Sequence, residues 1–256
     1  MKSLAFLLSF LSNPLEYIGA VAASLPTVIH KKGIRKRDFF YDLDLCGACS
    51  LPIVLLICYL MGLVLGLQAA LQLRKVGTEI FIADLVGFSV LKEFGPLMVA
   101  MIATGRASSA FAAEIGTMQV NEEVSALKTM GINPIAYLVF PKLLALLIAM
   151  PLLTIFGDAA GLVGGLTVSN LFLDIPLSAY CSRTIAVLNN TTLLLGIYKS
   201  AVFSILITLS GCYCGFNSSL DAQGVGRGAT KAVVAAIFLV IIADALLTLL
   251  YSSFGY

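Results

Sequence analysis

One stretch decides how this chain is interpreted: residues 93–134, EFGPLMVAMIATGRASSAFAAEIGTMQVNEEVSALKTMGINP. It places a Gly-Pro pair, an arginine and four carboxylates beside long apolar sequence. The core of a bilayer penalises unpaired charge and unsatisfied backbone groups. The break and the charges therefore indicate a functional element of a membrane protein rather than a passive span.

The composition predicts an all-α polytopic membrane protein. Of the 256 residues, 59% are apolar and 12% are charged, and the mean hydropathy is +1.00. Soluble domains carry about 25% charged residues. The length allows about five or six helices of ~20 residues, so we expect one domain over residues 1–256.

Five stretches are long and apolar enough to be candidate spans: residues 45–73, 80–105, 143–173, 200–220 and 232–254. They place a five-span bundle within residues 45–256. The second is ambiguous because only residues 94–105 are free of charge, and 12 residues do not cross a core of ~30 Å. Either this helix is charged in its outer half, or it is broken at Gly95-Pro96.

The first 40 residues predict an interfacial and juxtamembrane region. Residues 3–29 are apolar but are divided by Pro14 and Pro26, and such short pieces are more often interfacial than spanning. Five Lys or Arg residues follow between Lys31 and Arg37, as suits the anionic cytoplasmic leaflet.

If that basic block is cytoplasmic, five spans place the C-terminus on the non-cytoplasmic side. The segments assigned to the cytoplasm then carry 11 Lys and Arg residues and the other segments carry five, in agreement with the positive-inside rule. The five are Arg74, Lys75, Lys92, Arg183 and Lys199.

A short cytoplasmic helix is expected between the second and third spans. Asn121 suits its N-cap, the carboxylates of Glu122 and Glu123 suit its first turn, and Gly131 suits its C-terminal cap. An ordinary loop helix fits these signals too. In favour of a docking role, the apolar side chains that include Leu127 and Met130 are expected to be exposed and to need a partner surface.

Several charges fall inside or at the ends of spans. Lys92 and Glu93 form either an internal ion pair or a polar contact for a substrate head group. Asp158 and Asp244 each stand alone in an apolar run. One explanation is a hydrogen bond between helices; the other is a role in binding substrate or transferring protons. Arg106, which closes the second span, is expected to be structural or coupling-related, as is Glu114.

No catalytic or metal-binding chemistry is indicated. The six cysteines lie almost entirely in apolar runs and are expected to be small buried residues. The run GVGRGATKA at residues 224–232 lacks the Walker A spacing, so no nucleotide site is expected in this chain. We expect no catalytic residue, no metal, no cofactor and no nucleic-acid partner.

With these residues in view, the chain resembles the MlaE/YrbE permease family, the membrane subunits of MCE-linked lipid ABC transporters. Three stretches carry the resemblance: residues 91–134, GDAAGLVGG at 157–165 and GVGRGATKAVV at 224–234. The first 45 residues depart from the family pattern, as does the cysteine-containing start of the first span.

The resemblance implies a homodimer in the bacterial inner membrane, with ATP bound by separate cytoplasmic ATPase subunits. A periplasmic MCE-domain protein and a small accessory cytoplasmic subunit are further implied partners. The helix at residues 122–130 would couple to the ATPase, and a cavity between the two copies would hold a phospholipid. The residues expected to line that cavity are Lys92, Glu93, Leu97, Met101, Leu63 and Leu67.

The main alternative is a proton-coupled secondary transporter that uses Glu93, Asp158 and Asp244 as carboxylate relays. It predicts inverted repeats, which the sequence does not display. A membrane scaffold would not need charges inside its spans.

Overall fold

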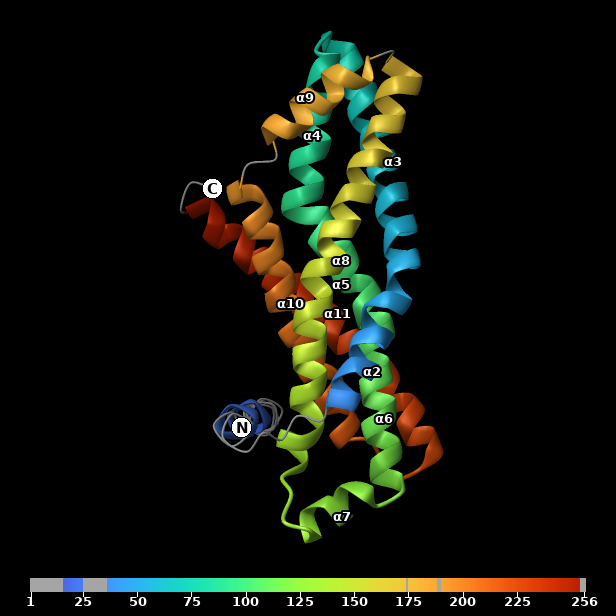
Figure 1. Ribbon diagram of the computed structural model, residues 1–256, viewed down its shortest axis with the longest axis vertical. Helices are drawn as coiled ribbons and strands as arrows, with labels where there is room; N and C mark the ends of the chain where they lie inside the picture. The colour runs from blue at the N-terminus through green and yellow to red at the C-terminus, as the bar shows by residue number, and fades with distance from the viewer. Residues whose placement is uncertain (1–15, 25–35, 174, 188–189, 254–256) are drawn as a thin grey trace, which may run out of the picture. The chain divides into compact units, whose positions relative to one another are not determined.

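The computed structural model describes residues 16–24, 36–173, 175–187 and 190–253, and all its regular elements are helices (Figure 1). Residues 16–24 are helical; the rest of the predicted interfacial region, up to residue 35, lies outside the described residues. The longer helices are α2 (Lys36–Cys46), α3 (Leu51–Val76), α4 (Ile82–Ser89), α5 (Gly95–Ala103), α6 (Ser109–Val120), α7 (Glu123–Thr129), α8 (Pro134–Leu173), α9 (Leu177–Val187), α10 (Asn190–Phe216) and α11 (Ala222–Ser253). Short 3-10 turns occupy Ala48–Ser50 and Glu79–Phe81.

Five helical segments of the described chain are long and apolar enough to cross a membrane: Arg37–Val76, Glu79–Val120, Pro134–Leu173, Thr191–Phe216 and Ala222–Ser253. This confirms the predicted all-α polytopic fold. All five begin before the predicted spans, because helices continue through charged residues at their ends. The fourth span, predicted from residue 200, begins at Thr191, which places Lys199 inside the helix.

The second span is continuous, so the alternative of a break at Gly95-Pro96 is wrong. A π-helical turn, Val90–Phe94, precedes α5, and a second one, Thr104–Ser108, follows it. The Gly95 N–H donates to the carbonyl of Val90, five residues back, and the next residue, Pro96, has no N–H to donate. The helix accommodates the proline by widening locally, as π-turns at functional sites often do. Of the two alternatives, the helix with a charged outer half is correct.

The chain forms two compact units. Unit 1 comprises residues 1–46, 104–146 and 205–239, and unit 2 comprises residues 47–103, 147–204 and 240–256.

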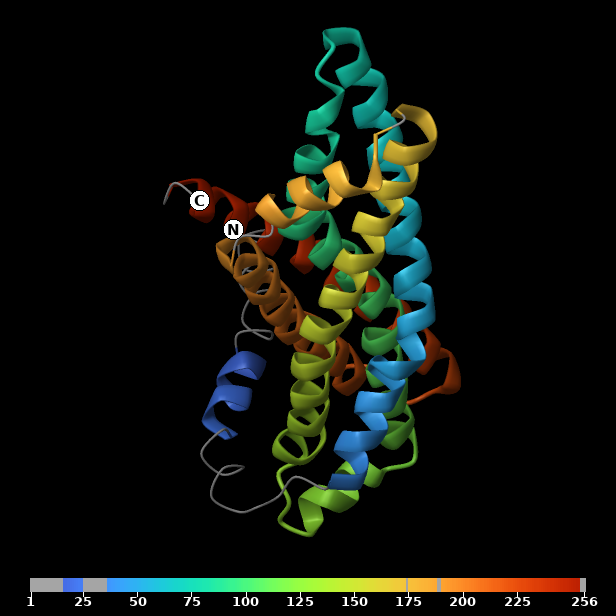
Figure 2. The ribbon, with the colours of Figure 1, turned by 45° about the horizontal axis from the view of Figure 1, so that its top comes forward.

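In unit 2, α3 and α8 run side by side over a glycine-lined contact (Figures 1 and 2). A Cβ on Gly62 would overlap the carbonyl of Gly161, and a Cβ on Gly164 would overlap the carbonyl of Tyr59. Small residues let membrane helices approach closely enough for backbone-to-backbone packing. These glycines fix where α3 meets α8.

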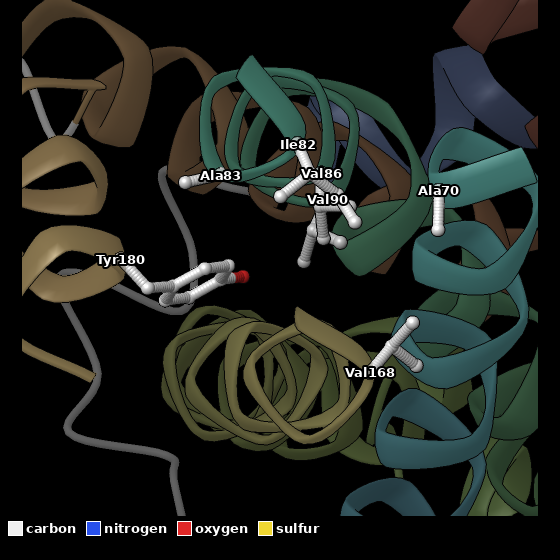
Figure 3. Close-up of a cluster of buried hydrophobic side chains, with 7 residues drawn as sticks. All are labelled: Ala70, Ile82, Ala83, Val86, Val90, Val168 and Tyr180. Carbon is white, nitrogen blue, oxygen red and sulfur yellow. The ribbon is translucent and has the colours of Figure 1, made fainter. Parts of the chain in front are cut away.

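A buried apolar cluster joins four helices of unit 2 (Figure 3). Its members are Ala70, Ile82, Ala83, Val86, Val90, Val168 and Tyr180. Tyr180, on α9, donates a hydrogen bond from its hydroxyl to the carbonyl of Leu162 at 3.3 Å. Burial raises the pKa of Tyr180 to about 12, so the phenol stays neutral. A salt bridge of 2.9 Å between Arg183 and Asp84 also holds α9 against α4.

Candidate functional site

The Lys199 cluster, formed by Glu93, Lys199, Asp244 and Thr248, is the principal charged site of unit 2. Lys199 Nζ on α10 donates to Glu93 Oε2 at 2.6 Å, to Asp244 Oδ1 at 2.9 Å and to Thr248 Oγ1 at 2.9 Å. Thr248 in turn lies 3.2 Å from Glu93 Oε1. The π-turn before α5 supplies Glu93, and α11 supplies Asp244 and Thr248 one turn apart. The cluster ties three spanning segments together.

The cluster holds one ammonium group against two carboxylates. The Lys199 side chain is 0% exposed, whereas Glu93 is 30% exposed and Asp244 is 17% exposed. The carboxylates, and not the lysine, therefore reach the surface of the unit. A buried lysine that donates three hydrogen bonds is satisfied, so its desolvation is compensated.

Of the two alternatives for Lys92 and Glu93, the ion pair between these neighbours is not formed. Lys92 Nζ lies over the ring of Phe88, 4.8 Å from its centre, and Glu93 bonds Lys199 instead. Asp244 was expected either to make a helix–helix hydrogen bond or to serve a substrate, and it makes the former. The uncharged run before Lys199 is the sequence signal that places this lysine inside a span.

An apolar groove of about 590 Å³ lies on the exposed side of α10. It is lined by Thr191, Leu194, Leu195, Ile197, Tyr198 and Ala201. The ring of Tyr251 lies 6.0 Å from the Nζ atom of Lys199, the residue that follows the lining residue Tyr198. The Tyr251 hydroxyl is buried and has no hydrogen-bond partner among the residues that the structure describes. The groove and the charged cluster are thus neighbours.

Asp158, on α8, is 5% exposed, and within the described residues its Oδ1 atom has no hydrogen-bond partner. It lies against Gly95, where a Cβ would overlap Oδ1. Only glycine at position 95 leaves room for this carboxyl.

The other residues predicted to line a lipid cavity are spread over unit 2. Leu97 and Met101 are half-buried on α5. Leu63 and Leu67 on α3 pack against the apolar cluster of Figure 3.

Unit 1 contains a second buried lysine, also missed from the sequence. Lys142 Nζ on α8 lies 2.6 Å from Glu114 Oε2 on α6 and 3.3 Å from Asp42 Oδ1 on α2. The Lys142 and Asp42 side chains are 4% and 3% exposed, whereas Glu114 is 44% exposed. The ammonium also lies 4.9 Å from the centre of the Phe111 ring. Glu114, predicted to be structural or coupling-related, thus fastens α6 to α8.

The short helix α7 joins α6 to α8 in unit 1 (Figure 1). Asn121 was predicted to be the N-cap of this helix, but it is the C-cap of α6. The N-cap of α7 is Glu122, which has a φ of 60° and precedes the first helical residue, Glu123. The predicted glycine cap is confirmed, because Gly131 has φ of 73° and its N–H donates to the carbonyl of Lys128.

The exposure predicted for the apolar face of α7 is only partly right. Met130 is 64% exposed, but Leu127 is 9% exposed. Leu127 packs with Val124 and Leu138 in a small buried cluster. Leu127 therefore attaches α7 to its own unit, and the predicted coupling residues that remain exposed are Glu122, Glu123 and Met130.

Arg106 was predicted to close the second span, but the helix continues to Val120; Arg106 lies in the second π-turn and is half-buried. Cys46, Cys58 and Cys212 are buried as predicted, whereas Cys49 is exposed, contrary to prediction. Cys49 belongs to the short 3-10 turn Ala48–Ser50 before α3, in which Ser50 is the buried residue.

A family model described as Permease MlaE matches residues 39–250. The chain belongs to the MlaE permease family. This family match confirms the resemblance found in the sequence and leaves out the first 38 residues, where that resemblance was weakest.

Related proteins agree with this assignment. A probable ABC transporter permease protein of Rickettsia bellii is 39% identical over 205 residues, which cover 80% of this chain and 79% of the relative. A protein of Synechocystis with the same description is 31% identical over 211 residues, which cover 82% and 80%. Arabidopsis thaliana TRIGALACTOSYLDIACYLGLYCEROL 1, chloroplastic, is 29% identical over 228 residues, which cover 89% of this chain and 65% of that protein. This MlaE-family chain is an integral membrane protein and the permease of an ABC transporter.

Proposed function

We propose that this permease carries phospholipid between the bacterial inner membrane and a periplasmic MCE-domain protein, driven by ATP bound in separate cytoplasmic subunits. The observation that carries the proposal is the Lys199 cluster, a charged group held inside three apolar spans with its carboxylates open to the surface. Charges at such depth are costly and mark substrate pathways by default. An adjacent apolar groove suits acyl chains, and a polar cluster suits a head group.

The lipid assignment has support from one relative, since the name of the Arabidopsis protein contains the name of a glycolipid. Membership in a family of ABC transporter permeases favours ATP over the proton-coupled alternative. Glu93 and Asp244 also share one lysine, an arrangement that suits a fixed structural network better than a relay of separate carboxylates.

The working unit in this proposal is a homodimer with the C-terminus on the non-cytoplasmic side. Apolar side chains of α11 that include Phe238, Ile242, Leu246 and Leu249 are 41–69% exposed in the single chain, and a second copy or lipid would cover them. The coupling surface is formed by Glu122, Glu123 and Met130, which face outward from α7 and are available to a cytoplasmic ATPase.

Photo-crosslinking tests the lipid path directly. A photoreactive residue at position 93 or 97, in membranes that contain an acyl-labelled phospholipid, is expected to capture that lipid. The same residue at position 129, on α7, serves as the control and is expected to capture protein. Protein-only products at both 93 and 97 would place the lipid path elsewhere.

A further inference from the structure

We propose that the Lys199 cluster selects lipid head groups that carry an ammonium, with primary ammonium preferred over quaternary ammonium and both preferred over purely anionic head groups. This inference rests on the proposed lipid-transport function and adds the head-group class to it.

The charge of the cluster is the first argument. One ammonium and two carboxylates leave a formal charge of −1 on Glu93, Lys199 and Asp244 together. The positive member is 0% exposed and commits its three donor positions to Glu93, Asp244 and Thr248. It therefore has no free N–H for a lipid phosphate. What the cluster presents to a ligand is carboxylate oxygen and a net negative field, which attracts cations and repels anions.

The second argument is the unsatisfied hydroxyl of Tyr251. Tyr251 is 8% exposed, and its hydroxyl is buried without a hydrogen-bond partner in the described part of the chain. Buried hydroxyls of proteins normally have a partner, so an orphaned one indicates a group that the structure does not contain. A phosphate or ester oxygen of a bound lipid would accept this hydrogen bond while the ammonium of the same head group meets the carboxylates. The Tyr251 ring lies 6.0 Å from Lys199 Nζ, which places this tyrosine beside the cluster.

The third argument is the hydrogen-bonding capacity of the head group. Lys92 does not supplement Lys199 as a cation at the cluster, because its ammonium lies over the Phe88 ring. A zwitterionic head group offers its own ammonium to Glu93 and Asp244. If the head group has no ammonium, its phosphate faces the carboxylates of the cluster, and these like charges repel each other. Primary ammonium is preferred because it donates hydrogen bonds to carboxylate oxygen, which a trimethylammonium does not.

The test measures lipid competition on the purified full-length chain in its complex with the ATPase subunits. Acyl-labelled phosphatidylethanolamine is displaced by unlabelled phosphatidylethanolamine, phosphatidylcholine or phosphatidylglycerol with the same acyl chains. We expect displacement in that order, with phosphatidylglycerol at least about tenfold weaker than phosphatidylethanolamine, as one lost charge-assisted hydrogen bond produces. Glu93→Gln and Asp244→Asn are expected to reduce this ratio to near one. Asp84→Asn, which removes a carboxylate from the separate ion pair with Arg183, is expected to preserve the ratio.

A second variant guards against misfolding of the single ones. Glu93→Gln combined with Lys199→Met removes one charge of each sign, so Asp244 keeps the net charge of −1, and we expect the preference for ammonium to persist. Equal displacement by all three lipids in the wild-type complex would overturn the inference and leave lipid transport standing. An intact complex that binds none of the three lipids would instead overturn the proposed function. A preference unchanged in both single variants would place head-group selection elsewhere and overturn the inference as well.

Discussion

The carboxyl of Asp158 lies directly against Gly95, on the first turn after a π-helical segment and next to Pro96. Because Gly95 has no Cβ, the buried carboxyl of Asp158 fits between α5 and α8. The contact joins Gly95, which follows the π-helical turn of the second span, to Asp158, the one acidic residue in the apolar run of the third span.

Gly95→Ala is therefore expected to destabilise the permease by about 1–3 kcal/mol, because the new methyl group overlaps Asp158 Oδ1 in a packed interior. Thermal unfolding in detergent measures the loss. Gly95→Ala combined with Asp158→Ala should recover much of it, since the second change removes the overlapping carboxyl. Gly105→Ala is the matched control, because a Cβ there meets nothing within 4 Å. If Gly105→Ala and Gly95→Ala cost the same, this account of Gly95 is wrong.

Lys142→Met is expected to be strongly destabilising, by about 3–5 kcal/mol, because it leaves the Asp42 carboxylate buried without its cation. Glu114→Gln should cost less, since Glu114 is 44% exposed and solvent compensates for the change. Urea or thermal unfolding of the purified variants gives the comparison. Arg227→Met, which breaks the exposed pair with Asp221, should cost no more than about 1 kcal/mol. Equal costs at Lys142 and Arg227 would contradict the interpretation of Lys142 as a buried tie.

Glu123→Lys and Met130→Asp are expected to reduce co-purification of the ATPase while the permease still inserts, because both change the exposed surface of α7. Pull-down of the ATPase with the tagged permease measures this. Leu127→Asp is a different experiment, since it places a charge in the cluster with Val124 and Leu138 and should lower stability as well. Asp221→Lys, an exposed charge reversal between α10 and α11, is the control. Unchanged ATPase recovery for Glu123→Lys and Met130→Asp together would remove α7 as the docking element.

Arg106→Ala is expected to impair assembly of the complex more than lipid binding, because Arg106 lies in the π-turn Thr104–Ser108 of the second span and is not a member of the Lys199 cluster. Size-exclusion chromatography and lipid binding on the same preparation separate the two effects. A normal yield of assembled complex with lost lipid binding would reverse the role assigned to Arg106.

The sequence alone determined the class of protein and the course of the chain through its spans. Apolar runs of ~20 residues leave a bilayer-sized helix as the only structure that satisfies the backbone, so five spans followed from composition and length. The cap at Gly131 was equally local, because a positive φ at a helix end requires glycine or a close substitute.

Tertiary structure alone decided the partners of the charged residues. Lys199 lies 106 residues from Glu93 and 45 from Asp244 in the sequence, and Lys142 lies 100 residues from Asp42. Nothing in a helical period relates residues on different spans, so the adjacent Lys92 was the natural but wrong partner for Glu93. The burial of Leu127 could not be predicted for the same reason, because Leu127 packs against Leu138 of the next helix. Local sequence sets where a helix begins, ends and widens; which side chains meet depends on how separate helices pack.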